Sequence, residues 1–419
     1  MIRDIALAHG DDPALLEHLR PYQLRALEAI ATCGTPAAGM HAAVCDACDT
    51  IHMVPNTCGN RSCPHCQGRE RAQWVANRRA ELLPCDYFHV VFTLPPELRS
   101  LTSAFPQTVL GCMMRAAGDA VDYLCRDPRH LGAEVGQMAV LHTWRRDLGW
   151  HPHVHLIVTD GGWNAAQQRW ITAHRYGPDR RPFLLPVETL QAAFQRRLRR
   201  LLLRAYHQQD FASPPPHLIS RLSSVERFTA CLNAAIARPW VIRIEPPFGG
   251  PDAVLKYLGA YVNRVACSPA RITAHDPQAG TVTYTWRTNA DPHHLHSATI
   301  PATDFLTRFA QHILPPRFHR IRFRGLWATA YRATKLHVVQ RALGITTPPE
   351  PLPLTPPPPV PCPCGQGFLR SLPGTTSRLS PAQRRRILSE IRHMIRQRTD
   401  AHRTQHRNDH SLQEAACCA

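Results

Sequence analysis

The fold prediction depends on the stretch His151-Pro152-His153-Val154-His155-Leu156-Ile157-Val158-Thr159. Its histidines alternate with other residues in an apolar-rich segment, which predicts a β-strand. Side chains alternate faces along a strand, so His153 and His155 would point to one side, spaced to hold a single metal ion. With 25 histidines in 419 residues, chance gives about 1.5 His-x-His patterns. The chain has three, so the pattern is weak when taken alone, and core histidines are the alternative.

A second pattern, about a hundred residues further on, strengthens the first. Tyr257 and Tyr261 lie four residues apart in a segment, 254–265, that reads as a short helix. Residues at i and i+4 share a helix face, so both phenols could face one centre. With nine tyrosines, chance gives about 0.2 such pairs, and the chain has one. An aromatic packing pair is the alternative interpretation.

The segments around these two patterns predict a sheet with helices packed on it. The expected strands are 87–94, 137–144, the histidine strand closed by a turn at 160–162, and 240–245 broken by Pro246-Pro247. Helices are expected over 98–124 and 190–206. Strands 137–144 and 151–159 would form a hairpin that places the histidines in the middle of the sheet. The prediction is therefore an α+β fold with an antiparallel sheet.

The charge of the chain favours a polyanionic partner. Lysine and arginine number 49 against 31 acidic residues, a net charge of +18, and the pI is near 9.8. Such a balance is typical of nucleic-acid-binding proteins, so DNA is the expected partner. A merely basic protein is the alternative.

Membrane insertion and secretion are not expected. No segment approaches the ~20 apolar residues that span a bilayer, and the opening Met1-Ile2-Arg3-Asp4 lacks the apolar stretch of a signal peptide. Fifteen cysteines, five of them between Cys45 and Cys66, favour metal coordination in a reducing compartment. We therefore expect a cytoplasmic protein that is associated with the nucleoid when bound to DNA.

The cysteine spacing predicts a structural zinc site near the N-terminus. Cys45-x-x-Cys48 and Cys63-x-x-Cys66 could hold one Zn²⁺ through four thiolates, with Cys58, His65 and His52 as spare ligands. Free buried cysteines are the alternative. Nearby arginines suit a phosphate-facing surface or are simply solvated: Arg61, Arg69, Arg71, Arg78 and Arg79.

Taken together, these motifs resemble the two-tyrosine HUH transposases of rolling-circle insertion sequences, the insertion sequence 91 family. The resemblance covers most of the chain, and the segments that carry it are Cys45-x-x-Cys48, Ser62-Cys63-Pro64-His65-Cys66-Gln67, Phe92-Thr93-Leu94-Pro95, His151-Pro152-His153-Val154-His155 with Gly161-Gly162, Tyr257-Leu258-Gly259-Ala260-Tyr261 with Arg264-Val265-Ala266, and Phe305-Leu306-x-Arg308-Phe309-x-x-His312-Ile313-Leu314-Pro315.

The resemblance implies an HUH endonuclease-like domain that nicks one DNA strand at an element's single-stranded or hairpin end and transfers it to target DNA. His153 and His155 would bind Mg²⁺ or Mn²⁺, and Tyr257 and Tyr261 would be paired nucleophiles that form 5′-phosphotyrosine links. The third metal ligand stays open between His151 and Asn263.

Two flanking cations, Lys256 and Arg264, would contact DNA or be solvated. A plasmid replication initiator or relaxase with the same chemistry is one alternative function. A non-catalytic zinc-dependent DNA-binding protein is the other.

The predicted organisation has three parts: a helical and zinc-binding domain over 1–84, the catalytic domain over 85–335, and a Pro-rich linker with a basic tail over 336–419. Ten of the sixteen residues from Pro348 to Pro363 are proline, which predicts an extended spacer that ends the globular part. Cys362 and Cys364 have no partner pair nearby, so no metal is expected there. Ser380-Pro381 predicts the start of a basic amphipathic helix, against a disordered tail.

Overall fold

The computed structural model describes residues 1–176, 181–238, 240–261, 266–288, 291–347, 350, 359–377 and 379–393. For 67–71, 181, 248 and 258–261 it describes the backbone alone. No helix in these ranges is both long enough and apolar enough to cross a bilayer.

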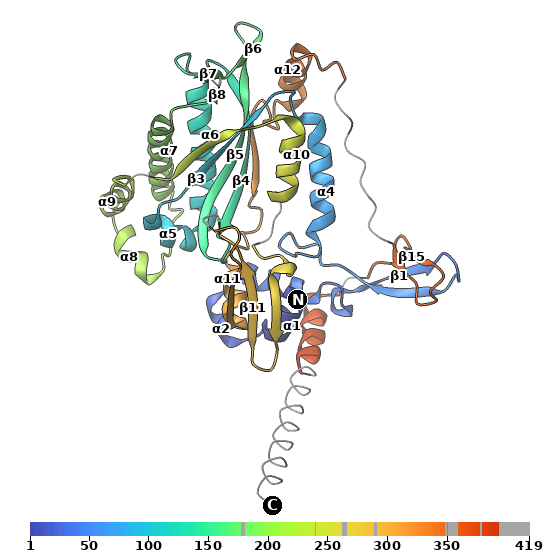
Figure 1. The fold of residues 1–419 in the computed structure, drawn as a ribbon. Helices are drawn as coiled ribbons and strands as arrows, with labels where there is room; N and C mark the ends of the chain where they lie inside the picture. The colour runs from blue at the N-terminus through green and yellow to red at the C-terminus, as the bar shows by residue number, and fades with distance from the viewer. Residues whose placement is uncertain are drawn as a thin grey trace, which may run out of the picture.

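An antiparallel sheet forms the centre of the molecule (Figure 1). Its strand order is β13-β4-β5-β3-β9, and β6 pairs with the far end of β5. The strand bounds are β3 Tyr87–Thr93, β4 Glu134–Trp144, β5 Trp150–Asn164, β6 Arg169–Thr172, β9 Ile242–Phe248 and β13 Ile321–Gly325. The expected hairpin is confirmed: β4 and β5 pair through His142↔His153, and the histidine strand is the central one.

Two of the predicted strand ends are wrong, each for a local reason. The turn expected at 160–162 is instead strand, because β5 continues to Asn164 and pairs with β6 there. A side chain at Gly161 would lie 2.5 Å from the Ile171 carbonyl oxygen, so glycine lets the two strands approach. Strand β9 runs through Pro246 and Pro247 because it is an edge strand whose register with β3 shifts at these two residues, so the irregularity accommodates the missing N–H groups.

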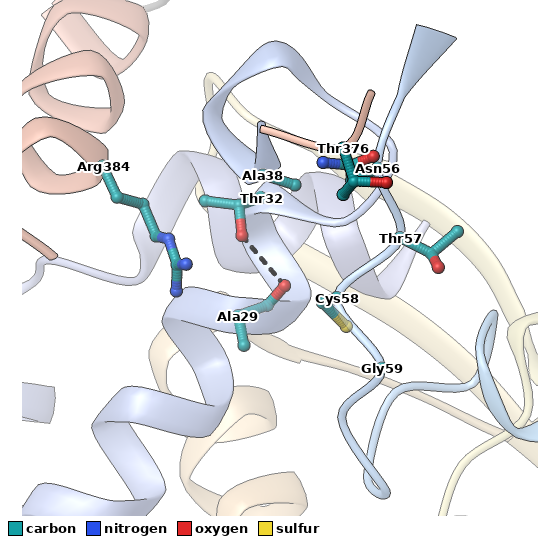
Figure 2. A pocket seen from close by; sticks show the side chains of 9 residues that line it. All are labelled: Ala29, Thr32, Ala38, Asn56, Thr57, Cys58, Gly59, Thr376 and Arg384. Carbon is teal, nitrogen blue, oxygen red and sulfur yellow. Dashed lines mark hydrogen bonds between the residues drawn. The ribbon is translucent and has the colours of Figure 1, made fainter. Parts of the chain in front are cut away.

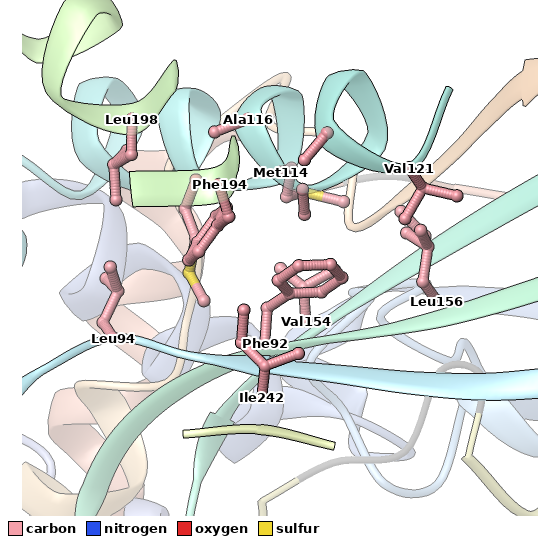
Figure 3. Close-up of a cluster of buried hydrophobic side chains, with 14 of the residues drawn as sticks. Phe92, Leu94, Met114, Ala116, Val121, Val154, Leu156, Phe194, Leu198 and Ile242 are labelled. Atoms are coloured by element: carbon pink, nitrogen blue, oxygen red, sulfur yellow. The ribbon is translucent and has the colours of Figure 1, made fainter. Parts of the chain in front are cut away.

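Helices cover one face of the sheet and bury the largest core. The helices of this layer are α5 Arg99–Ala104, α6 Pro106–Arg126, α7 Val187–His207, α8 Pro216–Leu222 and α9 Val225–Ile236. Figure 3 shows Phe92, Val154 and Leu156 of the sheet facing Met114 and Phe194 of the helices. Alternate residues of β5 therefore point into this core, which leaves the histidines on the other face.

The opposite face carries a smaller core beneath α4 Gln67–Arg78, α10 Gly250–Tyr261 and α12 His337–Ala342. Val140 and Ile157 of the sheet contact Val254 and Leu255 of α10 here. Packing of α10 on this face brings the predicted tyrosine helix over the histidine strand (Figure 1).

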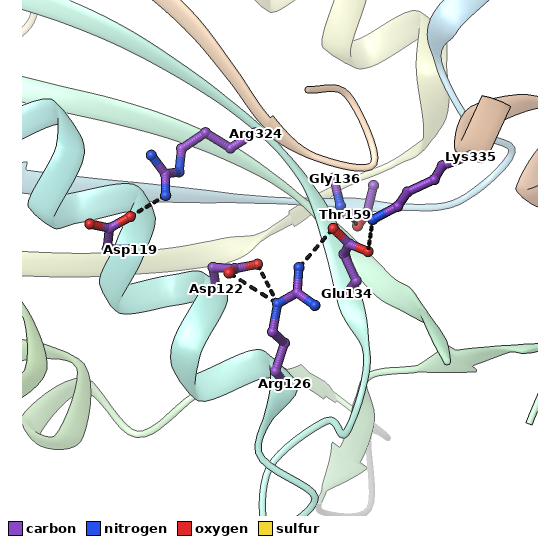
Figure 4. Close-up of polar contacts among 8 residues, drawn as sticks. All are labelled: Asp119, Asp122, Arg126, Glu134, Gly136, Thr159, Arg324 and Lys335. Carbon is purple, nitrogen blue, oxygen red and sulfur yellow. Dashed lines mark hydrogen bonds and ion pairs between the residues drawn. The ribbon is translucent and has the colours of Figure 1, made fainter. Parts of the chain in front are cut away.

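Ion pairs join the sheet to helix α6 and to the π-helix Arg332–Leu336 (Figure 4). Glu134 of β4 accepts from Arg126 at 2.7 Å and from Lys335 at 2.9 Å. Arg324 of β13 donates to Asp119 of α6. These contacts hold α6 and the π-helix, which lie on opposite faces, against strands β4 and β13 of the sheet.

A second globular unit lies below the sheet (Figure 1). It combines the N-terminal helices, an internal segment and the C-terminal helix. It contains α1 Ile2–His9, α2 Pro13–His18, α3 Pro21–Thr32, β10 Ile272–Asp276, β11 Thr281–Trp286, β12 His296–Pro301 and α11 Ala302–Ala310. The predicted C-terminal helix is present over residues 381–393. Ser380 caps it by accepting from the Gln383 N–H at 3.3 Å, and its Leu388 is 2% exposed in the core of this unit.

The segment after the proline run returns to the N-terminal region, contrary to the prediction that the globular part ends there. β14 Val360–Pro361 and β15 Phe368–Ser371 join β1 Met40–Cys45 and β2 Ile51–Pro55 in a four-stranded sheet. The remaining short elements are β7 His174–Tyr176, β8 Arg181–Phe183 and the 3-10 turns Pro36–Ala38, Arg79–Glu81, Pro96–Leu98 and Pro269–Arg271.

Candidate active site and cysteine clusters

Three histidines gather on the sheet face beneath α10. His153 and His155 come from β5, and His142 lies opposite His153 on β4. One ring nitrogen from each of the three lies within 4.8 Å of the others, which is close enough for one metal ion. The third histidine of this group is thus His142, and the His151 ring is not among the three. Sequence reasoning missed His142, because counting back from the loop pairs Trp144 with Trp150 and His142 with Pro152, and only a register shift between His142 and Trp144 sets His142 opposite His153.

The hydrogen bonds of the histidines set which nitrogen is available to a metal. His153 Nδ1 lies 2.7 Å from the His151 carbonyl oxygen, so Nδ1–H donates and Nε2 keeps its lone pair. Burial lowers the pKa of His153 to about 4 and lowers that of His155 as well. Both rings are therefore neutral at physiological pH, and the neutral imidazole is the form that ligates metals.

The hydroxyl of Tyr257 sits beside this group. Its Oη lies 3.1 Å from His155 Nδ1 and 3.0 Å from His89 Nε2. His89 Nδ1 in turn lies 2.7 Å from Glu245 Oε2. A carboxylate can only accept, so His89 Nδ1–H donates to Glu245 and Nε2 is an acceptor, which lies 3.0 Å from Tyr257 Oη and 2.8 Å from His155 Nδ1.

Sequence reasoning missed His89 and Glu245. They face each other across β3 and β9, in the register His89↔Glu245. The His89 side chain is 9% exposed and that of Glu245 is 51% exposed. The only available signal was a histidine within the otherwise apolar strand 87–94.

The other predicted site residues are described less fully. Lys256 is exposed on α10 next to Tyr257. The backbone of Tyr261 ends α10, one turn beyond Tyr257, and its side chain is not described. Arg264 and Asn263 lie outside the described residues.

The predicted zinc ligands Cys45, Cys48, Cys63 and Cys66 do not share one site, so their grouping is corrected. The structure divides them between two clusters, Cys33 with Cys58, Cys63 and Cys66, and Cys45 with Cys48, Cys362 and Cys364. The expectation that Cys362 and Cys364 lack a partner pair is also wrong. Strand β15 brings them back to β1, and spacing along the chain could not reveal that contact.

Both clusters have dimensions that fit zinc. Four sulfurs placed tetrahedrally at ~2.3 Å from one ion lie about 3.8 Å apart. Cys66 Sγ is 3.6 Å from the sulfurs of Cys33 and Cys58 in the first cluster. In the second, the Cys45–Cys364 and Cys48–Cys362 pairs are 3.8 and 3.9 Å apart.

Zinc binds the thiolate form of cysteine, and in each cluster the pKa of one thiol is lowered while the pKa of another is raised, Cys58 in the first cluster and Cys362 in the second. Hydrogen bonding from Cys33 lowers the pKa of Cys63 to about 4. Hydrogen bonding from Thr50 lowers the pKa of Cys48 to about 6. His52, predicted as a spare ligand, lies with Nε2 3.4 Å from Cys362 Sγ, beside the second cluster.

Two arginines predicted to suit a phosphate-facing surface contact protein groups instead. Arg61 donates to the carbonyl oxygens of Leu314, Pro315 and Phe318. Arg78 pairs with Glu81 at 2.8 Å. Both side chains therefore hold the first zinc-binding segment and α4 in place.

Comparison with known proteins gives two family-model matches. Residues 136–335 match the model described as "Putative transposase", which spans the three-histidine group and Tyr257. Residues 5–94 match the "Transposase zinc-binding domain", which contains the whole first cluster and half of the second.

Two curated proteins are similar along most of their length. The chain is 38% identical over 328 residues to "Putative transposase y4qJ" of Sinorhizobium fredii, covering 78% of this chain and 79% of the relative. It is 29% identical over 341 residues to "Transposase for insertion sequence element IS801" of Pseudomonas savastanoi pv. phaseolicola, covering 80% and 77%. No solved structure shows a significant match.

Proposed function

Because the chain belongs to the insertion sequence 91 family of transposases, we propose that it nicks one DNA strand through Tyr257 and carries out rolling-circle transposition through 5′-phosphotyrosine intermediates. The observation that carries the proposal is the Tyr257 hydroxyl within 3.1 Å of His155 Nδ1, at the border of the three-histidine group.

Tyr257 Oη attacks the phosphorus of the scissile phosphodiester. The new Oη–P bond forms as the P–O3′ bond breaks. The new 5′ end of the DNA is therefore joined to the tyrosine through its phosphate, and the new 3′ end leaves as a hydroxyl. The phenolic proton passes to His89 Nε2, which lies 3.0 Å away, and Glu245 holds the other side of that ring. The 3′ oxygen takes up one proton from water as it leaves, while the phenolic proton stays on His89 Nε2.

His142, His153 and His155 are the residues that would hold the catalytic metal. A bound Mg²⁺ or Mn²⁺ would supply Lewis-acid stabilisation of charge on the phosphate. A donor set of three imidazole nitrogens suits Mn²⁺ better than Mg²⁺, which prefers oxygen ligands.

Tyr261 is proposed as the second nucleophile, one helical turn further along α10. Two tyrosines would let the first hold the donor strand while the second takes the strand that follows, so no covalent intermediate is released. Lys256, exposed beside Tyr257, and Arg264 are proposed to contact the DNA backbone. The expected substrates are single-stranded or hairpin element ends and the target DNA, consistent with a net charge of +18.

The test is capture of the covalent intermediate. Full-length protein is incubated with a labelled single strand that carries the element end, with Mn²⁺, and the adduct is separated on a denaturing gel. We expect an adduct from the native protein and none from Tyr257→Phe. Tyr176→Phe, which changes an exposed tyrosine of β7, is the matched control and should behave as native.

Tyr261→Phe should still form the first adduct and fail in transfer of the second strand. A protein that binds the strand with native affinity yet forms no adduct in any metal would refute the proposal, and it would favour a non-catalytic DNA-binding protein.

A further inference from the structure

We propose that Cys45, Cys48, Cys362 and Cys364 hold a second zinc ion. This ion would link the C-terminal segment 359–377 to the N-terminal hairpin formed by β1 and β2, although the whole catalytic domain lies between the two segments in the sequence. The matched zinc-binding domain ends at residue 94, so half of this ligand set lies outside it. The proposal is independent of the nicking chemistry.

The two cysteine pairs lie close enough together to share one ion. Cys45 and Cys364 are 319 positions apart in the chain, yet their sulfurs are 3.8 Å apart. The four sulfurs all lie within 4.8 Å of one another. In each pair, one sulfur accepts from a backbone N–H two residues further on: Cys45 from Ala47 at 3.4 Å and Cys364 from Gln366 at 3.5 Å. Such turns direct both sulfurs of a pair toward one point.

The backbone at Gly367 allows the two cysteine pairs to come into contact. A side chain at Gly367 would lie 2.9 Å from Cys45 Sγ and 2.6 Å from Asp46 Oδ1. Asp46 instead accepts from the Phe368 N–H at 2.7 Å, and its own N–H donates to the Phe368 carbonyl at 3.1 Å. Glycine at this position therefore allows the C-terminal turn to sit against the first cysteine.

The sheet β14-β15-β1-β2 has too little core to hold itself together. Its large apolar side chains lie largely in solvent: Ile51 is 63% exposed, Met53 57%, Val360 51% and Phe368 45%. The residues buried near its centre are Ala43, Cys45 and Cys362. A small unit without a core depends on a cross-link, and structural zinc contributes folding energy directly.

The second zinc would also affect the placement of the C-terminal helix, residues 381–393. Ser377 links its approach to the N-terminal hairpin through Met40, whose carbonyl accepts at 2.8 Å. Figure 2 shows the pocket at this junction, where Arg384 of the helix faces Thr32 of α3, Thr57 and Cys58. The second zinc would thus hold in place the segment that leads to this helix, which packs on the second globular unit.

The experiment counts zinc in full-length, reduced protein and measures amide hydrogen exchange. We expect two zinc ions per chain in the native protein and in Cys112→Ser/Cys231→Ser, a matched double variant of two partly buried cysteines outside both clusters. Cys362→Ser/Cys364→Ser should hold one. In that variant the amides of Asp46, Phe368 and Leu372 should exchange at least tenfold faster, while those of the β4–β5 hairpin keep native rates.

A second variant keeps every sulfur. Gly367→Val should weaken binding of the second zinc, measured by competition with a chelator, and leave the first unchanged. Two zinc ions retained in Cys362→Ser/Cys364→Ser would overturn the proposal. So would one zinc in the native protein, or mass spectrometry that finds these four cysteines oxidised to disulfides before reduction.

Discussion

Replacing Glu245 by glutamine tests whether His89 takes the proton from Tyr257. Glutamine keeps the size of the side chain and removes its charge, so the ring loses a charge-assisted hydrogen bond of 2.7 Å. The amide can also present its NH₂ group to His89 Nδ1, which would favour the tautomer whose Nε2 carries a proton. That tautomer cannot accept from the Tyr257 hydroxyl.

The size of the effect follows from the exposure of the carboxylate. A hydrogen bond to a charged group contributes about 1.5–3 kcal/mol, which corresponds to about 10- to 150-fold in rate. The Glu245 side chain is 51% exposed, so solvent screens its charge and the low end applies. We expect nicking to slow by about tenfold in Glu245→Gln. Removing the base itself in His89→Gln should slow it by about 10²–10⁴-fold.

The assay is single-turnover formation of the covalent adduct with saturating Mn²⁺ and DNA, together with a separate measurement of DNA affinity. Glu188→Gln, on the first turn of α7 on the opposite side of the sheet, is the matched control and should keep the native rate. DNA affinity should be unchanged in all three variants. A native rate in Glu245→Gln and His89→Gln would refute the assignment of His89 as the base. A parallel loss of DNA affinity would show that the pair acts in binding.

Four further outcomes are expected. His142→Gln should weaken Mn²⁺ binding at least tenfold by isothermal titration, because one of three nitrogens is lost, and unchanged affinity would remove His142 from the site. Leu156→Ala, at a fully buried position, should lower the free energy of unfolding in urea by about 3 kcal/mol, and a loss below about 1 kcal/mol would contradict the packing described. Burial lowers the pKa of His312 to about 3, and the unfolded value is about 6.5, so native stability is full above pH 6.5 and falls by about 1.4 kcal/mol per pH unit below it. His312→Gln should therefore lose about 1.4 kcal/mol less than native protein between pH 7.5 and 5.5, and equal losses would contradict the shift. DNA affinity should fall steeply between 50 and 200 mM salt, as expected when many cations displace counterions, and a flat response would count against backbone contacts.

The features that could be predicted from the sequence are those written in local spacing. Alternation in 151–159 placed His153 and His155 on one face of the central strand, and the pattern of 254–265 predicted the helix that carries Tyr257. Both depend on residues within a few positions of each other, where strand and helix periods apply directly.

The features that could not be predicted depend on partners far along the chain. His89 and Glu245 meet because β3 and β9 pair, although they are 156 positions apart. The Cys45 pair was joined to the wrong partner because Cys63-x-x-Cys66 is near in sequence, while the true partner follows the proline run. Spacing reports which cysteines form a pair and not which pairs share an ion.

The pairing of β1 with β15 has a consequence for synthesis on the ribosome. The first hairpin leaves the exit tunnel early, but one of its edges and two of its thiols wait until residue 371 has been made. Every shorter product ends with an unmatched strand edge, which is a template for aggregation. A copy that terminates after Gly325 but before β15 would therefore complete its central sheet and still lack the strand that pairs with β1.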